Sequence, residues 1–294
     1  MSDLVDLHVH SDRSCDGDLP PAELAALARK KGYRAISIAD HDTVDAYPEA
    51  IAAGEKEGVE VIPGVELTTI FKSREFHLLL PFVDWASPTI LKIIAEQSER
   101  RLAEARQRVD KIRGLGFDVT WEEVNAGSRG APPLGVKIAQ VIVDKPENRA
   151  RLGGMAAAGK LDQAPYLFYR EYFAESKPAY VPKDFIGLRQ ALELAPETGG
   201  IPVLAHPGAY FEMANRLDLE ELKAAGLVGL EVYTPYHTKK QVQYYLGLAE
   251  ELDLVPTAGS DFHGRIKPHV RLGDLKEGGY WMVEKLKERA AWKQ

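Results

Sequence analysis

The first 80 or so residues alternate short apolar segments with segments of helical periodicity. We predict strands at residues 4–9, 35–39, 59–62 and 76–82. Helices are predicted at residues 21–31 and 47–58, because these segments have helical character and a glycine follows or ends each one. Strand–helix–strand alternation of this kind is typical of an α/β fold with a largely parallel sheet.

The middle of the chain departs from this alternation. Residues 87–114 form a long charged segment whose apolar positions recur at helical spacing, and no convincing strand pattern follows before about residue 182. A helical segment at 186–195 then precedes predicted strands at 203–205, 230–233 and 255–258. We therefore expect an inserted, mainly helical subdomain at residues 87–182, within one α/β domain made of residues 1–86 and 183–294.

Composition and charge narrow the functional classes. The 294 residues include 37 Lys and Arg against 44 Asp and Glu, a net charge of −7, which argues against a broad basic surface for long nucleic acids. Cys15 is the single cysteine, which excludes an intrachain disulfide and fits a reducing compartment. No apolar run approaches the roughly 20 residues of a membrane span, and the N-terminal segment lacks a signal-peptide pattern. We expect a cytoplasmic protein without a membrane partner.

Histidines and acidic residues recur where the predicted strands end. His8 and His10 are two residues apart on the first strand, so their side chains face the same side. The other candidates, on later strands or in the loops after them, are Asp16, His41, Glu66, His77, His206, Asp261 and His263. In parallel α/β barrels this edge of the sheet carries the active site. Imidazoles and carboxylates without thiolates suit two or three divalent Zn, Mn or Fe ions.

Each candidate has an ordinary structural explanation when it is taken alone. Glu66 is also compatible with a salt bridge, and His77 with a histidine satisfied in the core. The repetition of the pattern, a strand followed by a histidine or an acid, favours a metal centre over a set of unrelated structural residues.

Five motifs carry a resemblance to a known family. They are DLHVHS at 6–11, IADHD at 38–42, PGVE at 63–66, AHPG at 205–208 and GSDFHG at 259–264. In order, spacing and strand context the chain resembles the PHP (polymerase and histidinol phosphatase) family of metal-dependent phosphoesterases, and more closely its stand-alone branch with a helical insertion. The resemblance implies a distorted (β/α)7 TIM-like barrel, with the insertion as a lid over the barrel mouth.

The resemblance also implies a ligand set and a reaction. The first metal would be held by His8, His10, Glu66 and Asp261, the second by Glu66, His77 and His206, and the third by Asp16, His41 and His263. Some relatives carry a histidine at position 16. A hydroxide bridging two metals would attack the phosphorus of a small phosphorylated metabolite or nucleotide, with Asp261 and Glu66 as catalytic residues. His237 is a candidate acid for the leaving group, or an exposed loop histidine beside Lys239 and Lys240.

The insertion is expected to select the substrate. Many relatives have Gly-Arg-Pro-His-Ile-Ala-Arg where this chain has residues 134–140, so Gly135 and Lys137 stand at the arginine and histidine positions. Lys137 could supply a point charge to a phosphate but not a bidentate contact. Further candidates for substrate binding are Arg101, Arg106, Arg129, Arg170 and Lys177. For each of these, a solvated surface position is an equally reasonable interpretation.

Three other functions compete with the phosphomonoesterase interpretation. The chain could be a phosphodiesterase or 5′-3′ exonuclease acting on cyclic phosphates or short oligonucleotides. It could be a metallohydrolase that acts on a bond other than a phosphate ester, such as an amidohydrolase. It could also be a metal-binding domain without activity, although a complete set of candidate ligands argues against that.

Overall fold

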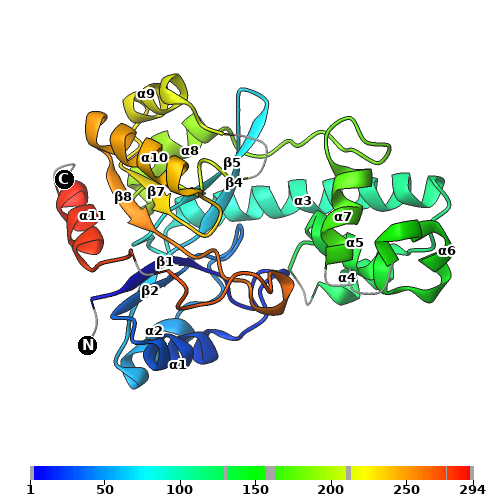
Figure 1. Cartoon of the computed structure of the whole chain (residues 1–294), viewed down its shortest axis with the longest axis horizontal. Helices are drawn as coiled ribbons and strands as arrows, with labels where there is room; N and C mark the ends of the chain where they lie inside the picture. The colour runs from blue at the N-terminus through cyan, green and yellow to red at the C-terminus, as the bar shows by residue number, and fades with distance from the viewer. Residues whose placement is uncertain (1–2, 129–130, 157–162, 210–212, 276, 292–294) are drawn as a thin grey trace. The chain divides into compact units, whose positions relative to one another are not determined.

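The computed structural model describes residues 3–128, 131–156, 163–209, 213–275 and 277–291. The chain divides into two compact units, one made of residues 1–94 and 186–294 and the other of residues 95–185 (Figure 1). The first boundary falls eight residues later than the predicted residue 86. The reason is that the long helix α3 (Pro88–Gly114) contributes its first apolar residues, Ile90 and Ile93, to the core of the first unit.

A three-stranded parallel sheet opens the first unit. Strands β1 (Val5–Val9), β2 (Ala35–Ile38) and β3 (Glu60–Pro63) pair in that order. Helices α1 (Pro21–Lys31) and α2 (Glu49–Glu57) connect them and pack against each other. Both helices end at a glycine with a left-handed conformation, which is the usual way a helix closes before a turn. The predicted strand–helix–strand alternation is confirmed here.

A five-stranded mixed sheet forms the rest of the first unit. Its strands pair in sequence order and are β4 (Glu66–Phe71), β5 (Arg74–Leu79), β6 (Val203–Leu204), β7 (Gly229–Tyr233) and β8 (Val255–Ala258). Strand β5 runs antiparallel to both β4 and β6, whereas β6, β7 and β8 are parallel. The sequence prediction missed β4 and expected a largely parallel sheet. The segment Glu66–Phe71 starts with a charged residue and contains two threonines, so its apolar pattern is weak.

Four helices accompany the second sheet. They are α8 (Leu188–Leu194), which was expected, and α9 (Arg216–Ala224), α10 (Lys239–Glu251) and α11 (Trp281–Ala291). Helix α8 packs on β4 and β5, α10 on β7 and β8, and α11 on β8. Among the described residues, no helix is long and apolar enough to cross a membrane.

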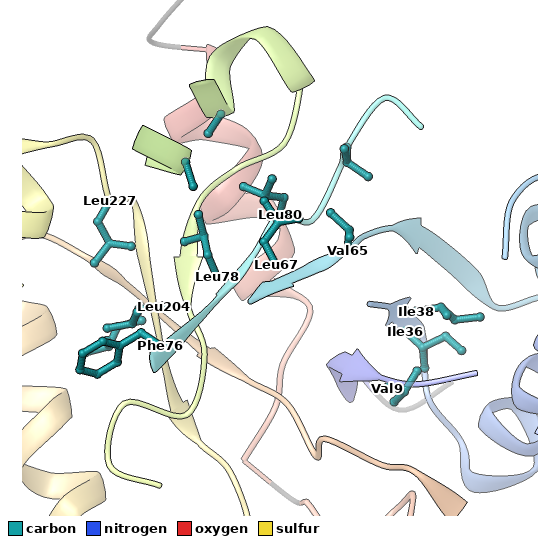
Figure 2. Packing of buried hydrophobic residues seen from close by; sticks show 14 of the residues in the cluster. Val9, Ile36, Ile38, Val65, Leu67, Phe76, Leu78, Leu80, Leu204 and Leu227 are labelled. Atoms are coloured by element: carbon teal, nitrogen blue, oxygen red, sulfur yellow. The ribbon is translucent and has the colours of Figure 1, made fainter. Parts of the chain in front are cut away.

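Apolar side chains of both sheets share one buried cluster. Val9, Ile36 and Ile38 enter it from β1 and β2, while Leu67 and Leu78 enter from β4 and β5 (Figure 2). Single backbone bridges join the sheets, from Val9 to Phe262 and from His41 to Glu66. These are isolated bridges rather than a continuous ladder, so the structure shows a mixed α/β fold, and the closed (β/α)7 barrel stays a prediction.

The second unit is helical. Besides the later part of α3 it contains α4 (Trp121–Gly127), α5 (Gly135–Asp144), α6 (Arg149–Leu152) and α7 (Ala164–Phe168). The described residues between 95 and 185 contain no strand. Their core is built from α3, α5 and α7, with Ile112, Ile138 and Phe168 fully buried.

Candidate metal centre

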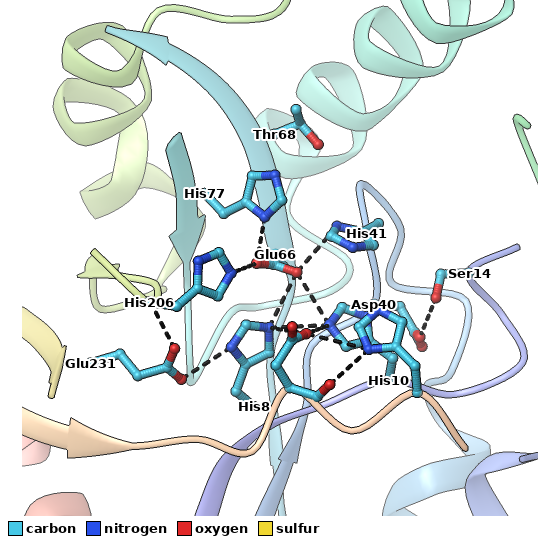
Figure 3. A network of polar contacts seen from close by, with 12 residues as sticks. His8, His10, Ser14, Asp40, His41, Glu66, Thr68, His77, His206 and Glu231 are labelled. Carbon is cyan, nitrogen blue, oxygen red and sulfur yellow. Dashed lines mark hydrogen bonds and ion pairs between the residues drawn. The ribbon is translucent and has the colours of Figure 1, made fainter. Parts of the chain in front are cut away.

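The Glu66 carboxylate lies at the centre of the histidines singled out above (Figure 3). Glu66 is the first residue of β4 and is fully buried. Its Oε2 atom lies 3.1 Å from His8 Nε2, 3.2 Å from His10 Nε2 and 3.1 Å from His41 Nδ1. Its Oε1 atom lies 2.8 Å from His77 Nδ1 and 3.1 Å from His206 Nε2. One carboxylate is therefore within contact distance of five imidazoles.

Three overlapping groups of side chains have the spacing that metal ligands need. The first group is His8, His10, Glu66 and Asp261, the second is His10, Asp16, His41 and His263, and the third is His41, Glu66 and His77. Within each group the candidate ligand atoms lie within 4.8 Å of one another. Compared with the ligand sets that the resemblance implied, the structure adds His10 to Asp16, His41 and His263, and it groups His41 rather than His206 with Glu66 and His77. These groups contain eight of the nine candidate ligands, and the ninth, His206, lies 3.1 Å from Glu66 Oε1, so all nine lie together in the first unit.

Asp261 and Asp16 extend the cluster on the side of β1. Asp261 Oδ1 lies 3.1 Å from His10 Nε2 and 3.3 Å from His263 Nδ1. Asp16 Oδ2 lies 3.2 Å from His263 Nε2 and 3.6 Å from His41 Nε2. Asp261 has a positive φ of 56°, which is uncommon for a residue other than glycine and frequent at functional sites.

The chemistry of these atoms fits divalent cations. His8 Nε2 and His10 Nε2 are 3.1 Å apart, although two imidazole nitrogens can form a hydrogen bond only if one of them carries the proton. Despite these close neighbours, four buried ligand atoms make no hydrogen bond of acceptable geometry within the described part of the chain, namely Asp16 Oδ1, Glu66 Oε2, Asp261 Oδ1 and His263 Nε2. Buried polar atoms without partners are costly, and a cation would satisfy them. Imidazoles with carboxylates are the donor set of Zn, Mn and Fe sites.

The ionisable groups of the cluster are strongly coupled. Burial alone would lower the pKa of His8, but Glu66, Glu231 and Asp261 outweigh it and raise that pKa well above its usual value. Burial would raise the pKa of Glu66, but the surrounding histidines hold it well below its usual value. In His41 burial prevails and lowers the pKa. Despite burial, the histidines likewise lower the pKa of Asp16 and, together with Lys267, that of Asp261, so the surroundings favour the ionised carboxylates that metal ligation needs.

Glu231, in the middle of β7, was missed as a site residue. Its Oε1 atom lies 3.0 Å from His8 Nδ1, and its Oε2 atom accepts a hydrogen bond of 2.8 Å from the backbone N–H of His206. The sequence offered an acidic residue inside an apolar strand and the family-like stretch from Glu231 to His237, but neither indicated its partners, which are 223 and 25 residues away. Two further residues, Tyr236 and Lys267, each donate a hydrogen bond of 2.6 Å to Asp261 Oδ2.

The contacts of His237 argue against the proposed acid role. Its Nδ1–H donates to the carbonyl oxygen of Val232 at 2.8 Å, and its Nε2 accepts from the N–H of Gly208 at 2.9 Å. Its ring stacks on Tyr245, and burial lowers its pKa. Both ring nitrogens are thus engaged in hydrogen bonds with the backbone. This makes His237 a neutral structural histidine rather than a proton donor or an exposed loop residue.

The candidate substrate residues all belong to the second unit. Arg101 is buried and its guanidinium lies 4.6 Å from the centre of the Phe185 ring, so a solvated position is wrong for it. Lys137 is half-buried on α5. Lys177 is exposed, and its Nζ atom lies 3.8 Å from Glu171 Oε2. Arg129 lies outside the described residues. Phosphate binding by these residues stays a prediction.

Comparison with known proteins gives consistent relatives. The chain is 30% identical over 266 residues to a 5′-3′ exoribonuclease of Haemophilus influenzae, which covers 90% of this chain and 91% of that protein. It is 28% identical to a phosphoribosyl 1,2-cyclic phosphate 1,2-diphosphodiesterase of Eggerthella lenta, over 91% of this chain and 97% of that protein. It is also 28% identical to a 3′,5′-nucleoside bisphosphate phosphatase of Chromobacterium violaceum, over 88% of this chain and 87% of that protein.

Fold and motif comparisons agree with these relatives. A crystal structure from Bifidobacterium adolescentis, described as a metal-dependent phosphoesterase, superposes with a TM-score of 0.83 at 27% identity, over 97% of this chain and 96% of that one. The PHP domain family matches residues 6–115, which contain six of the nine candidate ligands. Similarity that extends over nine-tenths of the chain, together with the gathered motif residues, shows that the chain belongs to the PHP family.

Proposed function

We propose that this protein is a metal-dependent phosphoesterase that hydrolyses a small phosphorylated metabolite or nucleotide. The observation that carries the proposal is the buried Glu66 carboxylate, which contacts five imidazoles and is shared by two of the three groups with metal-ligand spacing. The relatives support the same class, because their names describe hydrolysis of three kinds of phosphate ester.

The centre would hold two or three divalent Mn, Zn or Fe ions. We assign the first to His8, His10, Glu66 and Asp261, and the third to Asp16, His41 and His263 with His10 able to contribute. We assign the second to Glu66, His77 and His206, because both histidines contact Glu66 Oε1, with His41 as a further candidate ligand. When bound, these cations would lower the pKa of a water molecule in the site and neutralise the charge that develops on the phosphate.

The protein's own residues fix this arrangement. Glu66 is held between the two sets of imidazoles, so it can serve two neighbouring cations at once. Tyr236 and Lys267 hold the outer oxygen of Asp261 and leave its Oδ1 atom facing the histidines. We further propose that the two sheets belong to one distorted barrel and that the helical unit, residues 95–185, acts as the lid that selects the substrate.

A second candidate is cleavage of phosphodiesters or short RNA from the 5′ end. The resemblance to the Haemophilus influenzae exoribonuclease favours it. The net charge of −7 argues against tight binding of long polymers but not of a few nucleotides. Both candidates share attack on phosphorus at the same centre, so they differ only in the ester that the protein accepts.

A substrate panel tests the proposal. Mn²⁺-loaded protein is incubated with a nucleoside 3′,5′-bisphosphate, a 1,2-cyclic ribose phosphate, a 5′-phosphorylated oligoribonucleotide and a set of amides, and Asp261→Asn serves as the matched control. We expect hydrolysis of at least one phosphate ester by the wild type and none by the variant. Amide hydrolysis without cleavage of any phosphate ester would refute the proposal.

A further inference from the structure

Glu231 joins two of the candidate ligands from outside the cluster. Its Oε1 atom contacts His8 Nδ1 at 3.0 Å, and its Oε2 atom accepts from the backbone N–H of His206 at 2.8 Å (Figure 3). The side chain is fully buried in β7 and contacts the imidazole nitrogen of His8 that faces away from Glu66. We propose that Glu231 is a positioning residue that fixes His8 and His206 for metal binding. The inference rests on the proposed metal centre.

The two contacts require two acceptor atoms. The backbone N–H of His206 can only donate, so the oxygen opposite it must accept. At the other oxygen, His8 Nδ1 donates its proton and thereby leaves Nε2 without one when the ring is neutral. His8 Nε2 is the atom that lies 3.1 Å from Glu66 and 3.5 Å from Asp261. A carboxylate at position 231 therefore selects the tautomer of His8 that can bind a metal.

The surrounding backbone is shaped for this carboxylate. A Cβ atom at Gly259 would lie 1.9 Å from Glu231 Oε1 and 2.4 Å from His8 Cβ, so only glycine leaves room for the pair. His206 has a positive φ of 24°, a strained conformation for a residue other than glycine. The hydrogen bond from its N–H to Glu231 helps to hold that conformation and with it the direction of the His206 ring.

Glu231→Gln is the sharpest change, because it keeps the shape of the side chain and replaces one acceptor with a donor. A glutamine amide has one acceptor oxygen, so it cannot accept from both His206 N–H and His8 Nδ1–H. At one of the two contacts its NH2 group would face another N–H donor. Loss of such an outer contact usually weakens metal binding by about 10- to 100-fold. We therefore expect the affinity of the metal-free protein for Mn²⁺, measured by titration calorimetry, to fall by about that factor.

Thr257→Val is the matched control. Thr257 pairs with Glu231 in the register of β7 and β8, is buried, and its hydroxyl contacts the carbonyl oxygen of Leu230 rather than a histidine. It should bind Mn²⁺ like the wild type. Gly259→Ala displaces the Glu231 carboxylate without changing it and should weaken Mn²⁺ binding as Glu231→Gln does. Thermal unfolding of the metal-free variants shows that each one is folded.

A spectroscopic readout separates positioning from a structural role. In the Zn²⁺-loaded wild type, nuclear magnetic resonance with labelled histidine should show a slowly exchanging Nδ1 proton on His8, which weakens or disappears in Glu231→Gln. Unchanged Mn²⁺ affinity and an unchanged His8 signal in a folded Glu231→Gln variant would overturn the inference. Absence of metal binding by the wild type would instead overturn the proposed function, so the two failures can be told apart.

Discussion

At the scale of single residues, the sequence predicted those site residues whose signal lies in a short local segment of the chain. Seven of the nine candidate ligands lie in the five short motifs, Asp16 lies in the loop after the first motif and His77 lies on its own strand, so these signals are visible in the sequence. Glu231 binds histidines that are distant along the chain, so only the fold reveals it. The same holds for the space around Gly135, the position where the family resemblance implied an arginine. A Cβ atom there would lie 1.9 Å from Arg108 Nη1, because the guanidinium of this α3 residue fills that space.

Gly135→Ala is therefore expected to destabilise the helical unit. Arg108 is buried, pairs with Glu104 at 2.6 Å and packs beside the rings of Tyr169 and Phe173, so it cannot move aside freely. Overpacking of this kind costs about 1–3 kcal/mol. Calorimetry should show a lower unfolding temperature. Gly114→Ala is the control, since a Cβ atom there meets nothing within 4 Å, and it should be neutral or stabilising. Equal stability of the two variants would show that the space at Gly135 is not restricted.

At the scale of elements, periodicity predicted those with a strong apolar pattern. Strands β1 to β3 and helices α1, α2 and α3 lie within a few residues of their expected positions. Strand β4 was missed, and so were helices α9, α10 and α11. The antiparallel β4–β5 pair also depends on a tight turn at Lys72 and Ser73. Both residues have positive φ values, and because neither is a glycine the sequence does not indicate the turn.

One ion cluster ties that turn to α9. Lys72 Nζ lies 3.0 Å from Asp218 Oδ1, and Arg74 Nη2 lies 2.7 Å from Asp218 Oδ2. Asp218 also completes the capping box that starts α9 at Asn215. Burial would raise the pKa of Asp218, but hydrogen bonds from Arg74 and Lys72 outweigh it and lower that pKa below its usual value.

Asp218→Asn should lower the free energy of unfolding by about 1–2 kcal/mol at pH 7, because it removes charge-assisted hydrogen bonds from a buried carboxylate. A lowered pKa stabilises the fold above the unfolded value of about 3.9, and the benefit disappears as the pH falls through the folded value. The difference between variant and wild type should therefore shrink below about pH 4 in urea unfolding experiments. Glu220→Gln, in an exposed pair with Arg216, should have little effect at any pH. A pH-independent difference for Asp218→Asn would contradict the assignment.

At the scale of the whole molecule, the candidate ligands run from His8 to His263, so the centre exists only when both ends of the chain are folded together. Backbone hydrogen bonds from His10 N–H to Phe262 and from Asp261 N–H to His8 join those ends directly beside the cluster. The motifs predicted this convergence from their position at strand ends. The sequence did not predict the strand order around the proposed barrel equally well, because β4 and β5 pair antiparallel where a largely parallel sheet was expected.

Metal binding should therefore stabilise the first unit. A cation at 100 times its dissociation constant adds about 2.7 kcal/mol, which corresponds to a rise of roughly 5–10 °C in Tm for a unit of this size. Differential scanning calorimetry with and without Mn²⁺ measures the rise, and a chelator should reverse it. Asp261→Asn should show a smaller rise. Identical melting of the wild type at zero and saturating Mn²⁺ would mean that the cluster is not a metal site.

The number of divalent ions bound per chain tests the central claim most directly. Native mass spectrometry of the wild type, equilibrated with excess Mn²⁺ and then desalted, counts the ions on each folded chain. Two or three ions are expected, because Glu66 lies in two of the three ligand groups. The count should fall in Glu66→Ala. One ion or none on the folded wild type would contradict a multinuclear phosphoesterase centre.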